Sequence, residues 1–428
     1  MNDSESVYRS EVERGDQNSI GFGWTLVIVL FISLYFPTSI GGVINPHLTM
    51  IGNLLALFTL LYGAALFGIK FSGHILAAAA ILLLMLCVFS FLSPYTDITL
   101  GSVVPYLTLC IICSLKHQQL YFSRAQLKCL AVIVVSMLLF SLLVVADVKP
   151  VIEFQKSFYQ VFPDLFDFMV TWANKPVIMF ATHSVAGFAF FIIAIVSFLF
   201  SNVVSTTKLK FSLRTMSILC SVLLVLLISN TGFFLFFAML VVYLVYFLRH
   251  SHFAVLLVIC SVMLFLILDN LMFLLELSAE FSKLFFEVIL KENNGLLARM
   301  SMNSRLAGSY EYVFNSPLIG VGFTYGGDLA FGDNILSEYI LRAGFAGYFL
   351  VMLMVVGYLY ANLTSKLAFF LLLAFVLMSD LGYPLFVAFR FVFIFPVLII
   401  LVNMYTDMYR MKKRSSSMRF AVATPGAA

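Results

Sequence analysis

Long apolar runs separated by short polar connections dominate this chain. A helix needs about 20 apolar residues to cross a bilayer, so each run of comparable length predicts one membrane span. The expected spans are 21–40, 50–69, 75–93, 100–115, 128–146, 177–200, 213–229, 232–248, 253–275, 336–360, 367–379 and 388–405, of which 367–379 is short for a span. We therefore expect an all-α, polytopic bundle of about twelve transmembrane helices.

Composition supports the same class. Hydrophobic residues make up 62% of the chain, charged residues 11%, and the mean hydropathy is +1.05. These values lie far outside the range of soluble globular domains. The expected organisation is a tail over 1–20, one membrane domain over 21–405 and a basic tail over 406–428.

Lysine and arginine positions predict the orientation of the spans. Short loops rich in these residues stay in the cytoplasm. Placing both termini in the cytoplasm puts most of the 25 basic residues there. The acidic start of the chain is unlike the basic start of a signal peptide, so we expect the first helix to be retained. The net charge of +4 then reflects topology and indicates no nucleic-acid partner.

Two long segments, 147–176 and 277–335, fall on the external side in this topology. The first carries regularly spaced apolar residues that predict an amphipathic helix lying in the outer membrane interface: Val151, Ile152, Phe154, Phe158, Phe162, Leu165, Phe166, Met169 and Trp172. Every other connection is short, so any extracytoplasmic chemistry is expected on these two segments.

The positions of the cysteines, histidines and glycines argue against several kinds of site. The six cysteines lie in or beside the expected spans, where a thiol acts as a small apolar group. No two histidines have the spacing of metal ligands. The glycines after Leu318 match neither a dinucleotide fingerprint nor a phosphate-binding loop. We therefore expect no metal and no cofactor.

The second external segment contains a polar, aromatic and glycine-rich stretch, SRLAGSYEYVFNSPLIGVGF, from Ser304 to Phe323. The spacing of its apolar residues predicts a short helix that ends in a turn at 315–317, with an apolar face made of Leu306, Tyr310, Val313 and Phe314. Further on, Asp333, Asn334 and Glu338 lie at the start of the tenth span, one helical turn apart. A cation, Arg305, and a carboxylate cluster thus bracket a glycine turn.

These motifs resemble the O-antigen polymerase and O-antigen ligase superfamily of lipid-linked glycan transferases. The matching features are a basic residue before the external helix, the stretch NSPLIGVGF, a polar-Asn pair before a span, and a glycine inside that span. They correspond here to Arg305, Asn315, Pro317, Gly320, Gly322, Asp333, Asn334 and Gly344. A second match, KPVIMFATHS, places Lys175 and His183 at the opening of the sixth span, and a weaker one covers Ser229 to Gly232.

The resemblance implies a GT-C-like membrane fold and transfer of a glycan from undecaprenyl pyrophosphate at the periplasmic face of a bacterial inner membrane. It implies cations for the pyrophosphate and a base for the attacking hydroxyl. We expect Arg305 to bind the pyrophosphate and Asp333 to act as the base, with Glu338 in reserve. The other expected substrate-binding residues are Lys175, His183, Arg299, Asn315, Gly320, Gly322, Asn334, Arg342 and Arg390.

Within the superfamily, the resemblance favours a polymerase that joins repeat units by inverting, metal-independent transfer. Ligases of the superfamily carry His-Asn where this chain has Asp333 and Asn334. Lys175 replaces an arginine, which gives a point charge in place of a bidentate donor. A chain-length regulator and a flippase of the same pathway are the expected protein partners, besides membrane lipids.

The sequence is also compatible with other functions. A ligase that transfers glycan to lipid A core shares most of the motif. A flippase or other transporter for lipid-linked oligosaccharides is the alternative from a different class, although no internal repeat is evident. A non-catalytic regulator of chain length is the third.

The individual residues also have structural interpretations. Arg305 could pair with Glu311 or a phospholipid, Asp333 could cap the tenth helix, and Glu338 could be a solvated interfacial charge. Charges inside the spans predict an outward-facing vestibule with Asp269, Asp380 and Arg390 on its wall.

Overall fold

The computed structural model describes residues 17–36, 46–98, 100–159, 183–227, 230–248, 307–327, 329, 331, 334–380 and 384–422. Most of these residues are helical, and the only strands within these ranges are two short ones. The expected all-α class is therefore confirmed for the part of the chain that the structure describes.

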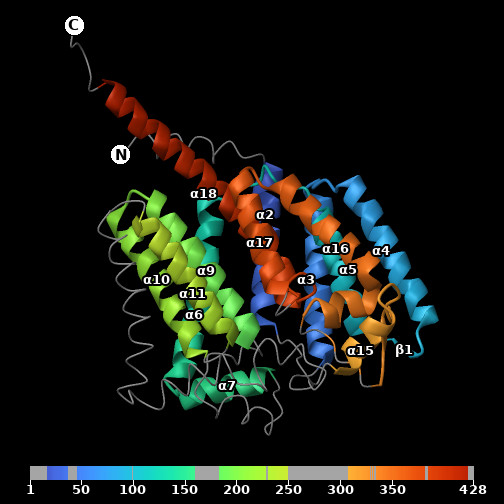
Figure 1. Cartoon of the computed structure of the whole chain (residues 1–428). Coiled ribbons are helices and arrows are strands. Elements are labelled where there is room, and N and C mark those ends of the chain that lie inside the picture. Colours follow the sequence, from blue (N-terminus) through green and yellow to red (C-terminus); the bar gives the residue numbers. More distant parts are fainter. Residues whose placement is uncertain are drawn as a thin grey trace, which may run out of the picture.

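The long helices run side by side as a bundle (Figure 1). Each expected span except 253–275 coincides with a helix, and 253–275 lies outside the described residues. The bundle helices are α2 (Gln17–Tyr35), α3 (Pro46–Leu66), α4 (Gly73–Leu92), α5 (Leu100–Ser114), α6 (Arg124–Val145), α9 (His183–Val203), α10 (Thr207–Leu226), α11 (Asn230–Leu248), α16 (Leu341–Asn362), α17 (Lys366–Asp380) and α18 (Phe389–Val422).

Seven helical stretches in the described ranges are long and apolar enough to cross a membrane. They are Asn18–Tyr35, Gly73–Leu92, Arg124–Val145, Val185–Val203, Thr207–Leu226, Leu336–Asn362 and Phe391–Lys413. Four further helices contain apolar stretches of 10–17 residues, which is short for a span. The chain is thus a multi-pass membrane protein, and the count of twelve spans stays a prediction.

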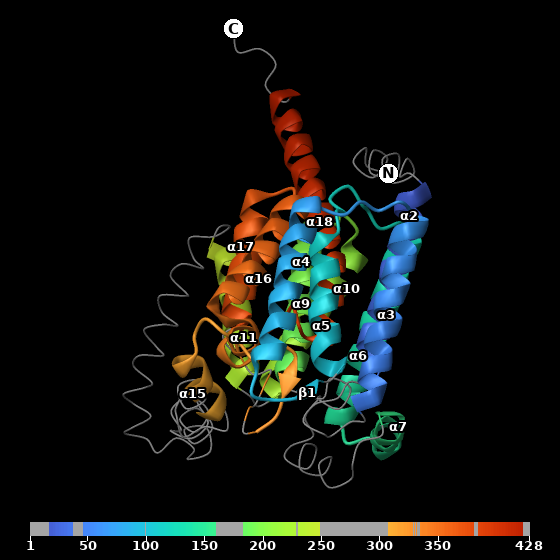
Figure 2. The same ribbon diagram turned by 90° about the vertical axis from the view of Figure 1, so that its right-hand side faces the viewer.

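The two ends of the bundle differ. We call one the α18 end, because α18 projects from it and α2 begins there, and the other the α15 end, where α15 (Ala307–Asn315) and α7 (Lys149–Tyr159) lie (Figure 2). The short helix α7 runs across the α15 end, with Ile152 buried and Phe154 56% exposed. This agrees with the amphipathic helix expected at the start of 147–176, whereas 160–176 lies outside the described residues.

Burial of apolar side chains holds the helices together. One large cluster joins buried residues of α7 and of all eleven bundle helices. A second, smaller cluster lies where α15 and the tenth span meet residues 317–323, which we call the glycine turn. Its members are Val313, Val321, Leu329, Ile340 and Leu341. This second cluster packs α15 and the glycine turn onto the start of the tenth span.

The tenth span is not a continuous helix. It begins with a π-helical turn, Leu336–Ile340, and continues as α16, which is broken at Gly344. Gly344 has φ 63° and ψ 179°, a conformation that L-residues other than glycine rarely adopt. A break of this kind removes helical hydrogen bonds and leaves backbone groups that need other partners.

The glycine turn supplies those partners. The N–H groups of Val321 and Gly322 donate to the carbonyls of Leu341 and Arg342 at 2.8 and 2.9 Å, and the N–H of Phe345 donates to Pro317 at 3.0 Å. The turn therefore pairs with the broken helix by backbone hydrogen bonds, much as one strand pairs with another.

Three glycines allow the turn to lie close to the backbone of its neighbours, two of them at the contact with the tenth span and one at the contact with α4. A Cβ on Gly320 would collide with the Arg342 backbone, and one on Gly344 would collide with the Leu318 backbone. A Cβ on Gly322, which has φ +64°, would meet the backbone of Leu86 in α4. Backbone cannot move aside as a flexible side chain can, so these positions require glycine.

The turn continues into β2 (Thr324–Tyr325), which pairs antiparallel with β1 (Asp97–Ile98) in the α4–α5 connection. Asp97 lies opposite Tyr325 and Ile98 opposite Thr324. The glycine turn is thus fixed on one side by α16 and on the other by the end of α4 and the start of α5.

A buried polar network fixes the loops at the α18 end. The Asn362 side chain accepts the His117 N–H at 2.6 Å and donates to the carbonyl of Leu115 at 2.9 Å. Asn403 in α18 donates to the Asn362 carbonyl at 2.7 Å. His117 is 1% exposed, and its Nε2 hydrogen-bonds the Tyr358 hydroxyl at 2.9 Å.

Replacement of the docked glycines by alanine should destabilise the fold strongly. Gly344→Ala combines a backbone conformation that is essentially restricted to glycine, which costs about 1–3 kcal/mol for other residues, with a backbone collision. The matched control is Gly68→Ala, because Gly68 has φ +64° with nothing within 4 Å of the added methyl. Thermal unfolding in detergent should show a markedly larger loss for Gly344→Ala than for Gly68→Ala.

For Gly320→Ala the control is Gly73→Ala, since no positive φ occurs at either position and only Gly320 faces a collision. Equal unfolding temperatures for Gly320→Ala and Gly73→Ala would contradict the close backbone approach.

His117 should make stability depend on pH. Burial lowers the pKa of His117 to about 3, so the folded protein resists a proton that the unfolded chain binds near pH 6.5. The free energy of unfolding should therefore be highest well above pH 6.5 and should fall as the pH decreases, by about 1.4 kcal/mol between pH 7.5 and 5.5. Denaturant unfolding at both pH values measures this difference, and His117→Gln should reduce it. An unchanged difference in that variant would assign the effect to other groups.

Candidate functional site

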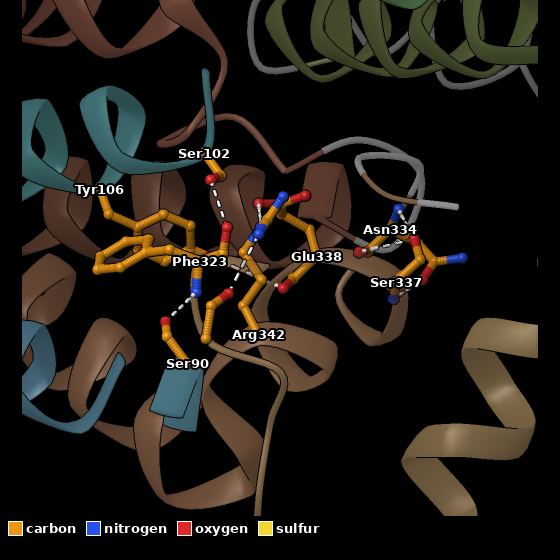
Figure 3. Close-up of polar contacts among 9 residues, drawn as sticks. Ser90, Ser102, Tyr106, Phe323, Asn334, Ser337, Glu338 and Arg342 are labelled. Atoms are coloured by element: carbon orange, nitrogen blue, oxygen red, sulfur yellow. Dashed lines mark hydrogen bonds and ion pairs between the residues drawn. The ribbon is translucent and has the colours of Figure 1, made fainter. Parts of the chain in front are cut away.

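A buried ion pair lies where the glycine turn meets the tenth span (Figure 3). The Arg342 Nε donates to the Glu338 Oε1 at 2.9 Å, and the two side chains are only 6% and 9% exposed. The pair spans the junction between the π-helical turn and α16. A spacing of four residues brings two side chains onto one helix face, which explains how local structure forms the pair.

Arg342 has two further partners. Its Nη1 donates to the Gly322 carbonyl at 3.1 Å, and its Cζ lies 4.0 Å from the centre of the Phe331 ring. The guanidinium thus contacts a carboxylate, a backbone carbonyl of the turn and an aromatic face at once. Because these groups come from both sides of the junction, Arg342 clamps the turn to the span.

Glu338 is not a solvated interfacial charge, since only 7% of the residue is exposed. Its N–H donates to the Asn334 carbonyl at 3.0 Å, as expected for residues one helical turn apart. The Tyr106 hydroxyl of α5 donates to the Glu338 carbonyl at 3.4 Å, which is a long hydrogen bond.

Asn334 organises the start of the span. Its Oδ1 accepts the Ser337 N–H at 3.0 Å, and the Ser337 Oγ accepts the Asn334 N–H at 3.1 Å. This reciprocal pair satisfies two backbone donors that a helix start leaves open. The Asn334 Nδ2 also donates to the buried Tyr310 hydroxyl at 2.7 Å. Asn334 therefore connects α15 directly to the tenth span.

Helix α15 confirms the short helix expected before the turn. Tyr310 and Val313 are buried as predicted, whereas Phe314 is 63% exposed and Leu306 lies outside the described residues. Burial, followed by the neighbouring Tyr95, raises the pKa of Tyr312. The Tyr312 hydroxyl thus stays protonated at neutral pH and is a poor base.

Two serines from distant helices hold Phe323. The Phe323 N–H donates to the Ser90 Oγ of α4 at 2.7 Å, and the Ser102 Oγ of α5 donates to the Phe323 carbonyl at 2.7 Å (Figure 3). The Thr324 hydroxyl adds a bond to the Ser93 Oγ at 2.7 Å. Sequence reasoning did not identify these hydroxyls, because a serine near the end of an apolar span gives no sign of its distant partner.

Asp380 lies at the end of α17 and is 1% exposed. Its Oδ1 accepts the Leu385 N–H and its carbonyl accepts the Ile335 N–H, both at 3.0 Å. The carboxylate is therefore buried inside the protein and does not lie on the wall of a water-filled vestibule. Asp269, the second acid of that hypothesis, lies outside the described residues.

The structure brings five of the sequence-predicted residues into one region: Gly320, Gly322, Asn334, Glu338 and Arg342. Asn315 ends α15 and is exposed. Arg305, Asp333, Lys175 and Arg299 lie outside the described residues, and His183 and Arg390 belong to α9 and α18 but their side chains are not described. The roles expected for these six residues stay predictions.

Among the described side chains, no group of three or more histidine, cysteine, aspartate or glutamate residues could hold a metal ion. No protein-family model, no curated protein and no solved structure matches the chain. The support for any function therefore comes from the chain's own residues and their arrangement.

Breaking the buried ion pair should cost more than breaking an exposed one. Arg342→Gln leaves Glu338 as a buried charge without its partner, which typically costs about 3–5 kcal/mol. The control is Arg410→Gln, because the Arg410–Asp407 pair at 3.5 Å is largely exposed and such pairs contribute about 0–1 kcal/mol.

Unfolding in detergent should show the double variant Glu338→Gln/Arg342→Gln to be more stable than Arg342→Gln alone. Additive losses for the two substitutions would mean that the side chains do not act as a pair.

Proposed function

We propose that the protein is a membrane glycosyltransferase that polymerises polyprenyl-pyrophosphate-linked glycan units at its α15 end. The observation that carries this proposal is that α15, the glycine turn and the start of the tenth span form one packed unit. The Tyr310–Asn334 hydrogen bond and the Arg342 clamp connect its parts. These are the segments that the resemblance to O-antigen polymerases and ligases singles out.

The reaction is a direct displacement at an anomeric carbon. The acceptor hydroxyl oxygen attacks this carbon, the bond from the carbon to the pyrophosphate oxygen breaks, and the electron pair leaves with polyprenyl pyrophosphate. Asp333 is proposed to take the hydroxyl proton. Pyrophosphate is a good leaving group, so cations that stabilise its developing charge suffice without a proton donor.

Arg305 is proposed to bind the pyrophosphate, with Lys175 and Arg299 assisting. Arg342 is proposed to position the site rather than bind substrate. Its guanidinium already contacts Glu338, Gly322 and Phe331, and the residue is 5% exposed. For the same reason Glu338 serves in this proposal as the partner of Arg342, and Asp333 remains the base.

The proposed location is the inner membrane of a bacterium, with the α15 end facing the periplasm. The charges of the described residues support this orientation. All of their acidic side chains except Asp407 lie toward the α15 end, while most of their lysines and arginines lie toward the α18 end. The proposed topology keeps twelve spans with both termini in the cytoplasm.

The ligase and transport alternatives are distinguished by product. A ligase would attach glycan to lipid A core, and a flippase would move the lipid-linked unit without forming a new bond. Discontinuous helices often line transport pathways. The break at Gly344 instead has its backbone groups bonded to the chain's own glycine turn, which favours the transferase.

The experiment is to incubate the purified protein with a lipid-linked repeat unit, without metal or nucleotide, and to resolve the products by length. A ladder of products is expected. Arg305→Ala should reduce the rate by about 100-fold or more while the protein stays folded. Lys149→Ala, which removes an exposed cation at the start of α7 on the same end, should leave the rate unchanged.

Transfer to lipid A core without a ladder would establish a ligase. Transfer of the lipid-linked unit across a liposome bilayer without either product would establish transport. Equal rates for wild type and Arg305→Ala would remove Arg305 from the site.

A further inference from the structure

The opposite end of the bundle carries an exposed basic surface on the first two turns of α10. We name it the α10 basic surface and define it by Lys208, Lys210 and Arg214. Lys208 and Arg214 are exposed and Lys210 is partly exposed. None of the three has an ion-pair partner in the described parts of the chain.

The local structure adds positive potential to this surface. The N-terminus of a helix carries a partial positive charge that acidic residues normally balance. The first turn of α10 contains no acidic residue, and the preceding Thr206 makes no side-chain capping hydrogen bond. Among the described residues, the only acidic side chain at the α18 end is Asp407, which pairs with Arg410 and Tyr121.

The surface is continuous with the lipid-facing side of α10. Phe211, Ile218 and Val222 are 73%, 58% and 48% exposed and lie on one face of this apolar helix. Arg214 lies one turn before Ile218 on the same outward side. A cation above an apolar, lipid-facing stripe can extend its charged group to the level of the lipid headgroups while its stem stays in the apolar region.

A neighbouring contact fixes α18 beside this surface. The Lys412 Nζ of α18 donates to the Asn202 carbonyl, at the end of α9, at 2.7 Å. The short connection 204–206 joins α9 to α10, so the base of the projecting part of α18 lies next to the start of α10 (Figure 1).

From the cations without ion-pair partners and the adjoining lipid-facing stripe, we infer that the α10 basic surface binds the headgroup of an anionic phospholipid in the leaflet at the α18 end. The headgroup phosphate supplies the negative charge that the described residues here lack, and the acyl chains follow the exposed apolar face of α10. This binding does not depend on the proposed glycosyltransferase activity.

The test measures phospholipid binding to the full-length protein by native mass spectrometry, with phosphatidylglycerol compared with phosphatidylcholine. Wild type should prefer phosphatidylglycerol. The triple variant Lys208→Gln/Lys210→Gln/Arg214→Gln should bind it about tenfold more weakly or worse. A charge-conserving variant, Lys208→Arg/Lys210→Arg/Arg214→Lys, should retain binding, which separates loss of charge from loss of fold.

The matched control, Lys70→Gln/Lys116→Gln/Lys366→Gln, removes the same charge from exposed positions at the same end. It should keep wild-type affinity for phosphatidylglycerol. Equally weak binding in the control would show that the loss follows from net charge alone. Unchanged binding in the α10 triple variant would show that the lipid binds at another site. Displacement of the lipid by equimolar inorganic phosphate would identify a soluble anion as the ligand. Each of these three results overturns the inference.

Discussion

The backbone-to-backbone contact between the glycine turn and the broken tenth helix is the constraint on which the α15 end depends. An apolar helix at the edge of a bilayer cannot leave N–H and C=O groups unpaired without a cost of several kcal/mol each. The break at Gly344 opens such groups, and residues 317–322 close them again. Only a residue without a side chain can approach the helix backbone so closely, which accounts for Gly320, while Gly322 allows the turn an equally close approach to the backbone of α4.

The Arg342–Glu338 pair follows from this contact. Burying two charges is costly, and a buried pair by itself contributes little net stability. Here the pair is coupled to a third group, the Gly322 carbonyl, that belongs to the glycine turn. The hydrogen bond from Arg342 to Gly322 forms only when the turn is docked, so the buried charges favour this arrangement of turn and helix over others. Ser90 and Ser102 fix the next residue, Phe323, in the same way from α4 and α5.

Much of this architecture could be predicted from the sequence, because helix positions in a membrane depend on local apolar length. The short helix before the turn and the one-turn spacing of Asn334 and Glu338 could be predicted as well, because both depend only on residues close together in the sequence. The Glu338–Arg342 pair also had a readable signal, since Glu followed four residues later by Arg is a favourable helix pair.

The remaining features depend on contacts between distant parts of the chain. Gly344 looked like a glycine inside a span, and nothing local indicates its positive φ. Ser90 is 233 residues from Phe323 and Ser102 is 221 residues from it. The apolar periodicity placed Phe314 on the buried face of its helix, yet it is exposed, because α15 is only nine residues long and rests on the span through Tyr310 and Val313.

Amide hydrogen exchange of the protein in nanodiscs tests the central contact most directly. The N–H groups of Val321, Gly322 and Phe345 each donate to a backbone carbonyl across the junction. They should therefore exchange as slowly as amides inside α16, although they belong to a turn and to a helix break. Exchange of these three amides as fast as that of an exposed loop would show that the glycine turn does not dock on the tenth span, and would contradict the account.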